Sequence, residues 1–538
     1  MPTARSSGRP VGHAGSRGVS RADAPARPAG AGRLAAAVRA TDDVRALLRF
    51  RLAGARGRGR VAAPVGLAAL VTLTVLAAVL PGLRGEEYGG LARADVVSLL
   101  PSAYLAVLVV AAVSVVASGG GRELLPAQQA AAYPVSPATD HLGALLLSPL
   151  NIAWLLQCWT LLALTSFAAG PGPAQAAGAV LALAWVGTAT ASAQALGWAV
   201  EWVRRGPRGP LLVRGGTVVV AATAVALIAT GRLTGVVAAG PTARLAAGVQ
   251  DAAAGRWLPW LRLLGLVLLL GAAAVPAGSW LAHRVARRPA RDELRVETAD
   301  RPARPHAGTD LVALMRTDRA GIWRSVPMRR GMTMLAVLPG AVAVAGAFGW
   351  DTMGIFPGLV ASGGALLFGV NSWCLDGRGA LWRDSLPVDP LVAFASRALV
   401  LVEILIAAAL VTLLLASVRA GLPTPAELVA VGCALVVVTL QVVSTALGWS
   451  VRSPHAVDLR SARATPAPPL VMVGYSARLA LGTTVTGLLF DLTSQGPWTW
   501  SVLLSVPFLL WSGLRLRRTA VAWRDPATRA RVVLTVAA

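Results

Sequence analysis

The sequence predicts an all-α polytopic membrane protein with about twelve transmembrane helices arranged as two six-helix repeats. Three observations predict this fold. The chain has 538 residues, of which 55% are hydrophobic and only 14% are charged, whereas soluble domains carry about 25% charged residues. Long apolar runs recur along the chain, each near the roughly 20 residues that a helix needs to cross hydrocarbon. The basic residues gather between alternate runs.

The first 60 residues precede the predicted membrane region. Residues 1–32 are rich in Arg, Gly, Pro and Ser and have almost no large apolar side chains, which predicts a disordered, Arg-rich cytosolic tail. Residues 33–60 carry Leu and Val at roughly helical spacing with Arg between them. This pattern predicts an amphipathic interfacial helix on an anionic membrane face, and the alternative is a tail helix packed on other protein.

Two membrane halves follow, residues 61–282 and residues 331–515. The expected spans of the first half are 62–82, 97–118, 143–168, 174–200, 211–230 and 256–282. The expected spans of the second half are 331–350, 355–373, 394–418, 424–449, 467–491 and 496–515. A shift of 253 residues, the separation of Pro137 and Pro390, brings the third, fourth and fifth runs of the two halves into register within a few residues. This correspondence predicts an internal repeat.

The hydrophilic segments that flank the second half complete the organisation. Residues 283–330 form the longest polar break and are expected to be a cytosolic linker. Within it, the stretch from Asp310 to Arg324 has apolar residues at helical spacing, which predicts a second pre-membrane helix. Residues 516–538 follow the last span and are expected to form a cytosolic C-terminal tail.

The distribution of arginine sets the expected orientation. Every basic residue is Arg, and most of them lie in the segments that share a side with the N-terminus. Under the positive-inside rule this asymmetry predicts cytosolic termini. The plasma membrane of a bacterium is the expected location. The net charge of +25 is therefore attributed to topology and contact with membrane lipids, and nucleic acid is not expected as a partner.

Several classes of chemistry lack the residues that they require. A phosphate-binding loop of the G-x-x-x-x-G-K type and a Schiff base both need Lys, which the chain does not contain. The three Cys lie far apart without a C-x-x-C pair, and the five His show no metal-ligand spacing. We therefore expect no cofactor, no metal site and no enzymatic activity of the chain itself.

Two loops carry the same short motif. Pro134-Val135-Ser136-Pro137 and Pro387-Val388-Asp389-Pro390 each precede the third span of their half. Ser and Asp can cap a helix N-terminus, and the following Pro suits the first helical position. Each loop is therefore expected to be an extended segment, a cap and a helix start. The alternative to a functional role is a simple helix-start signal at the membrane boundary.

A smaller group of candidates consists of polar residues within the predicted spans. These intramembrane polar residues are Asn151, Gln157, Asn371, Glu403 and Gln441. A carboxylate in a membrane is costly and tends to mark a pathway or a pair, so Glu403 is expected to mark a pathway, to make an inter-helix hydrogen bond or to pair with Arg397. The Asn and Gln side chains more often join helices by hydrogen bonds.

The two loops resemble the cytosolic coupling element of ABC-2 type permeases, the membrane subunits of ATP-binding-cassette exporters. The wider stretches from Glu123 to Gln157 and from Asn371 to Glu403 are similar to large fused permeases of actinobacterial type, and the resemblance covers most of residues 33–520. It implies that separate ATP-binding subunits, as a dimer, press on these loops. One departure is Asp389, which stands where the motif has Ser; a cap survives this change, whereas a contact that needs a neutral hydroxyl does not.

Three functions of different classes fit these observations. The leading hypothesis is a permease subunit that provides the translocation pathway for an exported substrate that the sequence does not specify. An ion- or proton-coupled secondary transporter is the first alternative, but it would carry several intramembrane charges and Glu403 is nearly alone. A polytopic membrane enzyme is the second alternative, and it would need a carboxylate or His cluster on a sizeable loop.

Overall fold

The computed structural model describes most of the chain. The described residues are 39–47, 49, 58–85, 87–88, 91–118, 135–150, 152–288, 307–346, 348–367, 369–456, 467 and 469–538. The predicted tail at 1–32 lies outside them, as do Pro134 and Asn151. Over these residues the fold is all-α apart from one short antiparallel pairing of β1 (Glu87–Tyr88) with β2 (Leu91–Ala92), as the sequence predicts.

The N-terminal half contains the helices that the apolar runs predict, together with short connecting helices. They are α2 (Arg58–Val79), η1 (Pro81–Leu83), α3 (Arg93–Ser118), α5 (Pro137–Leu147), η2 (Ser148–Leu150), α6 (Ile152–Ala169), α7 (Pro173–Arg204), α8 (Gly209–Ala229), α9 (Leu233–Ala239), α10 (Pro241–Ala253) and α11 (Trp257–Ala286).

The C-terminal half likewise consists of long helices joined by shorter ones. Its helices are α13 (Asp310–Arg324), α14 (Val326–Gly346), η3 (Trp350–Thr352), α15 (Ile355–Leu367), η4 (Gly369–Leu375), α16 (Gly379–Asp384), α17 (Pro390–Ala420), α18 (Pro425–Arg452), α19 (Pro469–Thr493), α20 (Trp498–Arg524) and α21 (Pro526–Ala537). Proline begins several of them, because its missing N–H is not needed in the first turn of a helix.

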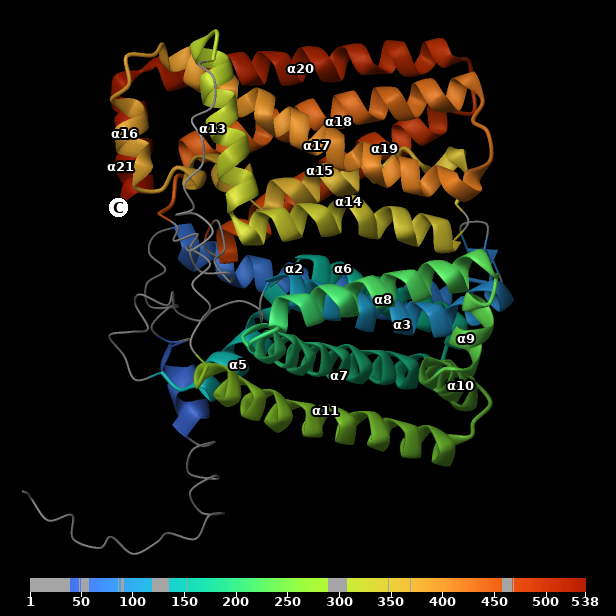
Figure 1. Cartoon of the computed structure of the whole chain (residues 1–538). Helices are drawn as coiled ribbons and strands as arrows, with labels where there is room; N and C mark the ends of the chain where they lie inside the picture. Colours follow the sequence, from blue (N-terminus) through green and yellow to red (C-terminus); the bar gives the residue numbers. More distant parts are fainter. Residues whose placement is uncertain are drawn as a thin grey trace, which may run out of the picture.

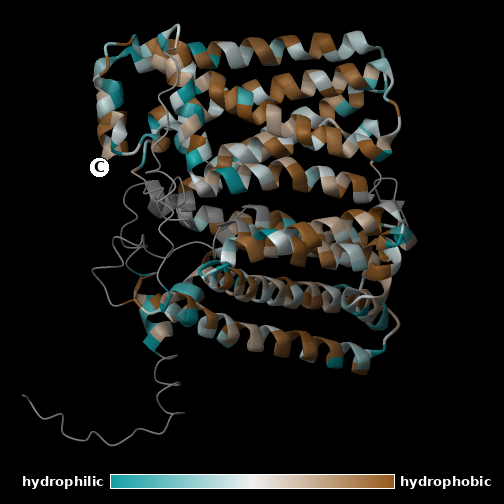
Figure 2. Cartoon of the chain, viewed as in Figure 1, coloured by the Kyte–Doolittle hydropathy of each residue, from teal (hydrophilic) through white to brown (hydrophobic). Residues whose placement is uncertain are grey.

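The long helices run side by side in two groups, one for each half (Figure 1). Helices α5, α13, α16 and α21 gather at one end of the molecule, and α9 and α10 lie at the other end (Figure 1). Apolar residues cover the lengths of the helices, whereas hydrophilic residues concentrate towards the two ends (Figure 2). This banded distribution is that of a protein embedded in a membrane.

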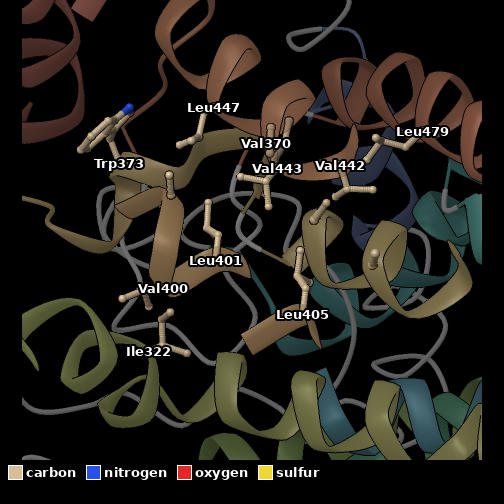
Figure 3. Packing of buried hydrophobic residues seen from close by; sticks show 14 of the residues in the cluster. Ile322, Val370, Trp373, Val400, Leu401, Leu405, Val442, Val443, Leu447 and Leu479 are labelled. Carbon is tan, nitrogen blue, oxygen red and sulfur yellow. The ribbon is translucent and has the colours of Figure 1, made fainter. Parts of the chain in front are cut away.

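Each half has its own hydrophobic core. In the N-terminal half, α3, α6, α7 and α10 contribute the buried residues, such as Leu162 and Leu181. In the C-terminal half, Leu401 and Leu405 of α17 meet Val442 of α18 and its neighbours (Figure 3). The halves contact each other where α14 packs on α3 and α19 approaches α6.

Seven helices of the described chain are long and apolar enough to cross a membrane, or eight if the bent pair of α15 and η4 is one span. The seven are α3, α7, α8, α11, α17, α18 and α20. Helix α8 is the most exposed of them, because no part of its most apolar stretch is buried. Several long apolar helices are thus present, and the twelve-span arrangement is taken up below as a proposal.

The expected third span, 143–168, is two helices instead of one. Helix α5 ends at Leu147, a 3₁₀ turn covers Ser148–Leu150, and α6 begins at Ile152. Pro149 lies in this turn, and proline both lacks an N–H and collides with the preceding helical turn. Pro149, with the polar residues Ser148 and Asn151 beside it in the sequence, favours a break at this point of the run.

The described part of the predicted N-terminal amphipathic helix and the predicted C-terminal tail are both helical, and both pack on other parts of the protein. Residues 39–47 bury Ala40 and Val44, and Val44 packs with Leu147 of α5. This part of the predicted amphipathic helix therefore adopts the packed alternative. The expected C-terminal tail, 516–538, differs from a tail: α20 continues to Arg524, and α21 lies against α16.

Candidate functional site

The second loop forms the connection between α16 and α17. Asp389 is the N-cap of α17, and its carboxylate accepts a hydrogen bond from the backbone N–H of Leu391 at 2.8 Å. Pro390 occupies the first helical position. The cap that the sequence predicts at this loop is confirmed.

The first loop contains the matching cap. The Ser136 hydroxyl accepts a hydrogen bond from the backbone N–H of Thr139 at 3.0 Å, and Pro137 begins α5. The Thr139 hydroxyl in turn donates to the carboxylate of Asp43 at 3.3 Å, which joins the N-terminal helical segment to the loop. Helix α5 lies at the same end of the molecule as α16 (Figure 1), so the two motif loops share one end.

A buried network of two carboxylates and two guanidinium groups supports the second loop. Arg397 of α17 contacts Asp376 at 2.7 Å and Asp318 of α13 at 3.1 Å. Arg383 of α16 donates to the same two carboxylates, at 3.2 Å to Asp376 and at 3.1 Å to Asp318. The Ser396 hydroxyl donates to Asp318 at 2.6 Å. The network thus joins three helices on both sides of the loop.

The charges in this network balance, which is what makes their burial possible. The side chains of Arg397 and Asp318 are each only 1% exposed. Burial opposes ionisation of Asp318, but Arg397 and Arg383 outweigh it and hold the pKa of this carboxyl below its ordinary value. The carboxylate is therefore charged at neutral pH. Its ion pairs hold the second loop in place between α13, α16 and α17.

A cavity of about 280 Å³ lies beside the anchored loop. Its lining includes Pro387, Val388 and Pro390 of the motif. The wall next to them contains Trp373 and Trp523, whose rings stack with centroids 4.0 Å apart. The indole N–H groups of both Trp are buried without a hydrogen-bond partner in the part of the chain that the structure describes. The cavity is thus a recess whose lining combines apolar side chains with charged ones, among them Asp384 and Arg529.

Glu403 makes an inter-helix hydrogen bond, as one of its expected roles predicts, but the alternative of a pair with Arg397 is wrong. Glu403 pairs with Arg319 of α13 at 2.7 Å, and both of these side chains are more than 40% exposed. Six residues along a helix correspond to a rotation of about 240°, so positions 397 and 403 face different sides of α17. Arg397 instead points towards Asp376 and Asp318.

The other intramembrane candidates lie apart from one another. Asn371 is buried in η4, and its side-chain amide donates to the carbonyl of His455 at 2.6 Å. The Gln441 side chain on α18 accepts from the Thr486 hydroxyl of α19 at 3.2 Å. Gln157 lies on α6. The contacts of Asn371 and Gln441 are the inter-segment hydrogen bonds that amides make within a bundle.

Sequence reasoning missed the acidic half of the network, although one signal was present. Asp318 stands between Leu314 and Ile322, at four-residue spacing, and all three are buried. A carboxylate within the apolar stripe of an amphipathic helix has to find a cation. The cations that pair with Asp318 come from segments 65 and more residues away along the chain and could not be assigned from spacing.

No group of His, Cys, Asp or Glu with the arrangement of a metal site occurs among the residues that the structure describes. Comparison with known proteins finds no matching family model, no matching curated protein and no matching solved structure.

Proposed function

We propose that this chain is the membrane permease subunit of an ATP-binding-cassette exporter, and that separate ATPase subunits supply the energy. The observation that carries the proposal is the pair of capped motif loops at one end of a helical, apolar molecule. We assign this end to the cytosol of a bacterium and the helices to its plasma membrane, because the arginine-rich segments lie on that side.

The twelve-span, two-repeat arrangement belongs to the same proposal. Helices α5 and α17 begin at Pro137 and Pro390, which are 253 residues apart, and α7 and α18 begin at Pro173 and Pro425. The matching starts support a duplicated unit. In this arrangement α5 and α6 together correspond to the single helix α17, and α15 with η4 is one bent span.

The mechanism follows from how the second loop is held. Its helices α16 and α17 are joined by Arg383, Arg397 and two shared carboxylates, so a push on the loop moves a rigid unit. The recess beside Pro387 and Val388 offers a seat for an apolar side chain of a partner. An ATPase dimer that closes on both loops would thereby tilt α17 and its counterpart in the first half.

The test is co-purification of the chain with ATPases encoded in neighbouring reading frames, alongside ATP-driven transport. Replacing residues 134–137 or 387–390 by Gly should weaken ATPase binding or uncouple hydrolysis from transport, and replacing both should do more. Leu422→Gly is the control, because Leu422 is 97% exposed in the loop between α17 and α18 and away from the motif.

Two results would contradict the proposal. Undiminished ATPase binding and transport in the variant with both loops replaced would reduce the motifs to helix starts. ATP hydrolysis by a contaminant-free preparation of the chain alone would remove the need for a separate ATPase subunit.

A further inference from the structure

A second, larger cavity lies between α18, α19 and α20. Its volume is about 630 Å³. Helices α19 and α20 both pack on α18 but make few contacts with each other. The cavity is therefore a groove with α18 as its floor and α19 and α20 as its walls, and we call it the basic groove.

Four guanidinium groups line the basic groove, and none of the residues that line it is acidic. They belong to Arg452, Arg478, Arg515 and Arg518. In the part of the chain that the structure describes, no ion pair joins any of these four to a carboxylate. This contrasts with the balanced network at the second loop. An uncompensated cluster of cations attracts an anion.

Two of the four guanidinium groups, those of Arg452 and Arg515, meet at one point in the groove. A methyl group placed on Gly448 would lie 3.4 Å from Nη2 of Arg452 and 4.0 Å from Nε of Arg515, so these two cations share the space over this glycine. The Arg515 guanidinium donates to the Thr445 hydroxyl at 3.0 Å. Thr519 adds a second buried hydroxyl at the same place. Both hydroxyls donate to backbone carbonyls of their own helices, so the guanidinium groups are the donors that suit phosphoryl oxygens here.

Arg478 does not belong to a loop, where the arginines that orient a membrane protein usually lie. It lies nine residues into α19, counted from Pro469, which is about 14 Å along the helix. The groove extends deeper still, from Arg452 to Gln441 on α18. Its outer side is apolar and exposed: Leu481, Leu510 and Trp511 are each more than 60% exposed. A ligand that fits both features has a charged head and apolar chains.

We propose that the basic groove binds the phosphoryl headgroup of an anionic phospholipid of the cytosolic leaflet, with its acyl chains along α19 and α20. Basic pockets between membrane helices at this level are suited to such headgroups. The groove opens sideways between two helices that barely touch, which gives a lipid direct access. The proposal requires a membrane-embedded chain and does not depend on a partner ATPase.

The test uses the full-length, delipidated chain mixed with phosphatidylglycerol or with zwitterionic phosphatidylcholine, and lipid retention is measured by native mass spectrometry. Phosphatidylglycerol should bind at least tenfold more tightly. The double variant Arg478→Gln with Arg515→Gln should bind it about thirtyfold more weakly, at the contribution expected for two basic residues. The double substitution by Lys should retain most of the preference, because it keeps the charge.

Neighbouring positions on α20 supply a matched control. Arg518→Gln should weaken phosphatidylglycerol binding, whereas Arg517→Gln should not, because Arg517 is exposed and does not line the groove. Equal retention of the two lipids, or an unchanged affinity of the double Gln variant, would overturn the proposal. Arginine-dependent binding of inorganic phosphate without binding of phosphatidylglycerol would assign the groove to a soluble phosphate and would also overturn it.

Discussion

Asp318 shows at the scale of one residue how the second loop is held. It is a carboxylate on the buried stripe of α13, and it receives hydrogen bonds from Arg383 and Ser396 as well as the charge of Arg397. A buried ion pair contributes little when complete, because desolvation offsets attraction, but its broken form is costly. The network is therefore a device for specifying one arrangement of α13, α16 and α17.

Removing this charge should destabilise the protein strongly. Asp318→Asn leaves two buried guanidinium groups with one carboxylate, and we expect a loss of about 3–5 kcal/mol in unfolding free energy. Thermal unfolding in detergent measures the effect. Asp384→Asn is the control, since Asp384 and Arg529 form a partly exposed pair and such pairs contribute about 0–1 kcal/mol. Equal effects of the two substitutions would contradict the assigned role.

The same carboxylate should make stability depend on acidic pH. Its pKa is below the ordinary value in the folded chain, so its contribution is complete above the unfolded pKa, near 4, and is lost as pH falls through the lower folded pKa. The difference in melting temperature between the wild type and Asp318→Asn should be constant from pH 7 to pH 5 and should shrink below pH 4. A difference that shrinks near neutral pH would refute this assignment.

The two caps should stabilise the starts of their helices without deciding whether the whole chain folds and inserts. Ser136→Ala or Asp389→Ala removes one hydrogen bond at a helix start and should cost about 1 kcal/mol. Both variants should still insert and accumulate, as measured by the yield of folded protein in size-exclusion chromatography. Ser136→Asp is the matched control, because Asp caps a helix as well as Ser does and is the residue of the second loop. Aggregation of the Ala variants would show a larger role than capping.

At the scale of elements, cap residues and prolines predicted where helices begin, but the apolar runs did not always show where a helix is broken. The starts of α5 and α17 followed from cap and proline chemistry at Ser136 and Asp389. The break between α5 and α6 was missed because the run 143–168 is apolar enough on average to suggest one span, despite Ser148, Pro149 and Asn151. The position 253 residues later is Val402, and there α17 is continuous. Pro149 is thus one difference between the corresponding elements, and it favours a break at this position.

The docking of α21 is a further feature that composition alone did not predict. Val532, Val533 and Val536 are buried and line the recess beside the second loop. Their spacing fits a single helix face, but a short amphipathic segment at a chain end does not reveal its partner. The packing site is created only when η4, α16 and α20 come together.

Helix α21 should protect the second loop. Val532→Asp places a charge at a fully buried position and should release the helix, so that limited proteolysis cuts between α16 and α17. Leu534→Asp is the matched control two positions away, because Leu534 is 60% exposed. If both variants resist the protease like the wild type, α21 does not shield the loop.

At the scale of the whole molecule, the fold class was predictable because composition and hydropathy are summed over the entire chain. The number of spans is harder to predict, since seven or eight helices of the described residues satisfy length and apolarity, and two further apolar helices are shorter. The ion network could not be predicted at all, because its members come from distant segments. Long-range pairing needs the three-dimensional fold.

Topology can be tested directly. Under the twelve-span proposal, reporter fusions after residue 240 should report the outside of the membrane, and fusions after residue 300 should report the cytosol. The physical reason is the arginine asymmetry, which retains the basic linker 283–330 on the inner side. Opposite results at both sites would overturn the proposed orientation and the two-repeat arrangement.

Helix α8 has a consequence for how this chain can change over generations. Its most apolar stretch has no buried part, so its side chains contact lipid and make few contacts with other parts of the protein. Lipid tails distinguish poorly among Val, Leu, Ile and Ala, whereas a packed core responds to a single methylene. Substitutions among these four residues should therefore accumulate freely in α8 and be purged in α18. The substitution rate at each position would then distinguish the residues that face lipid from those that pack against other protein.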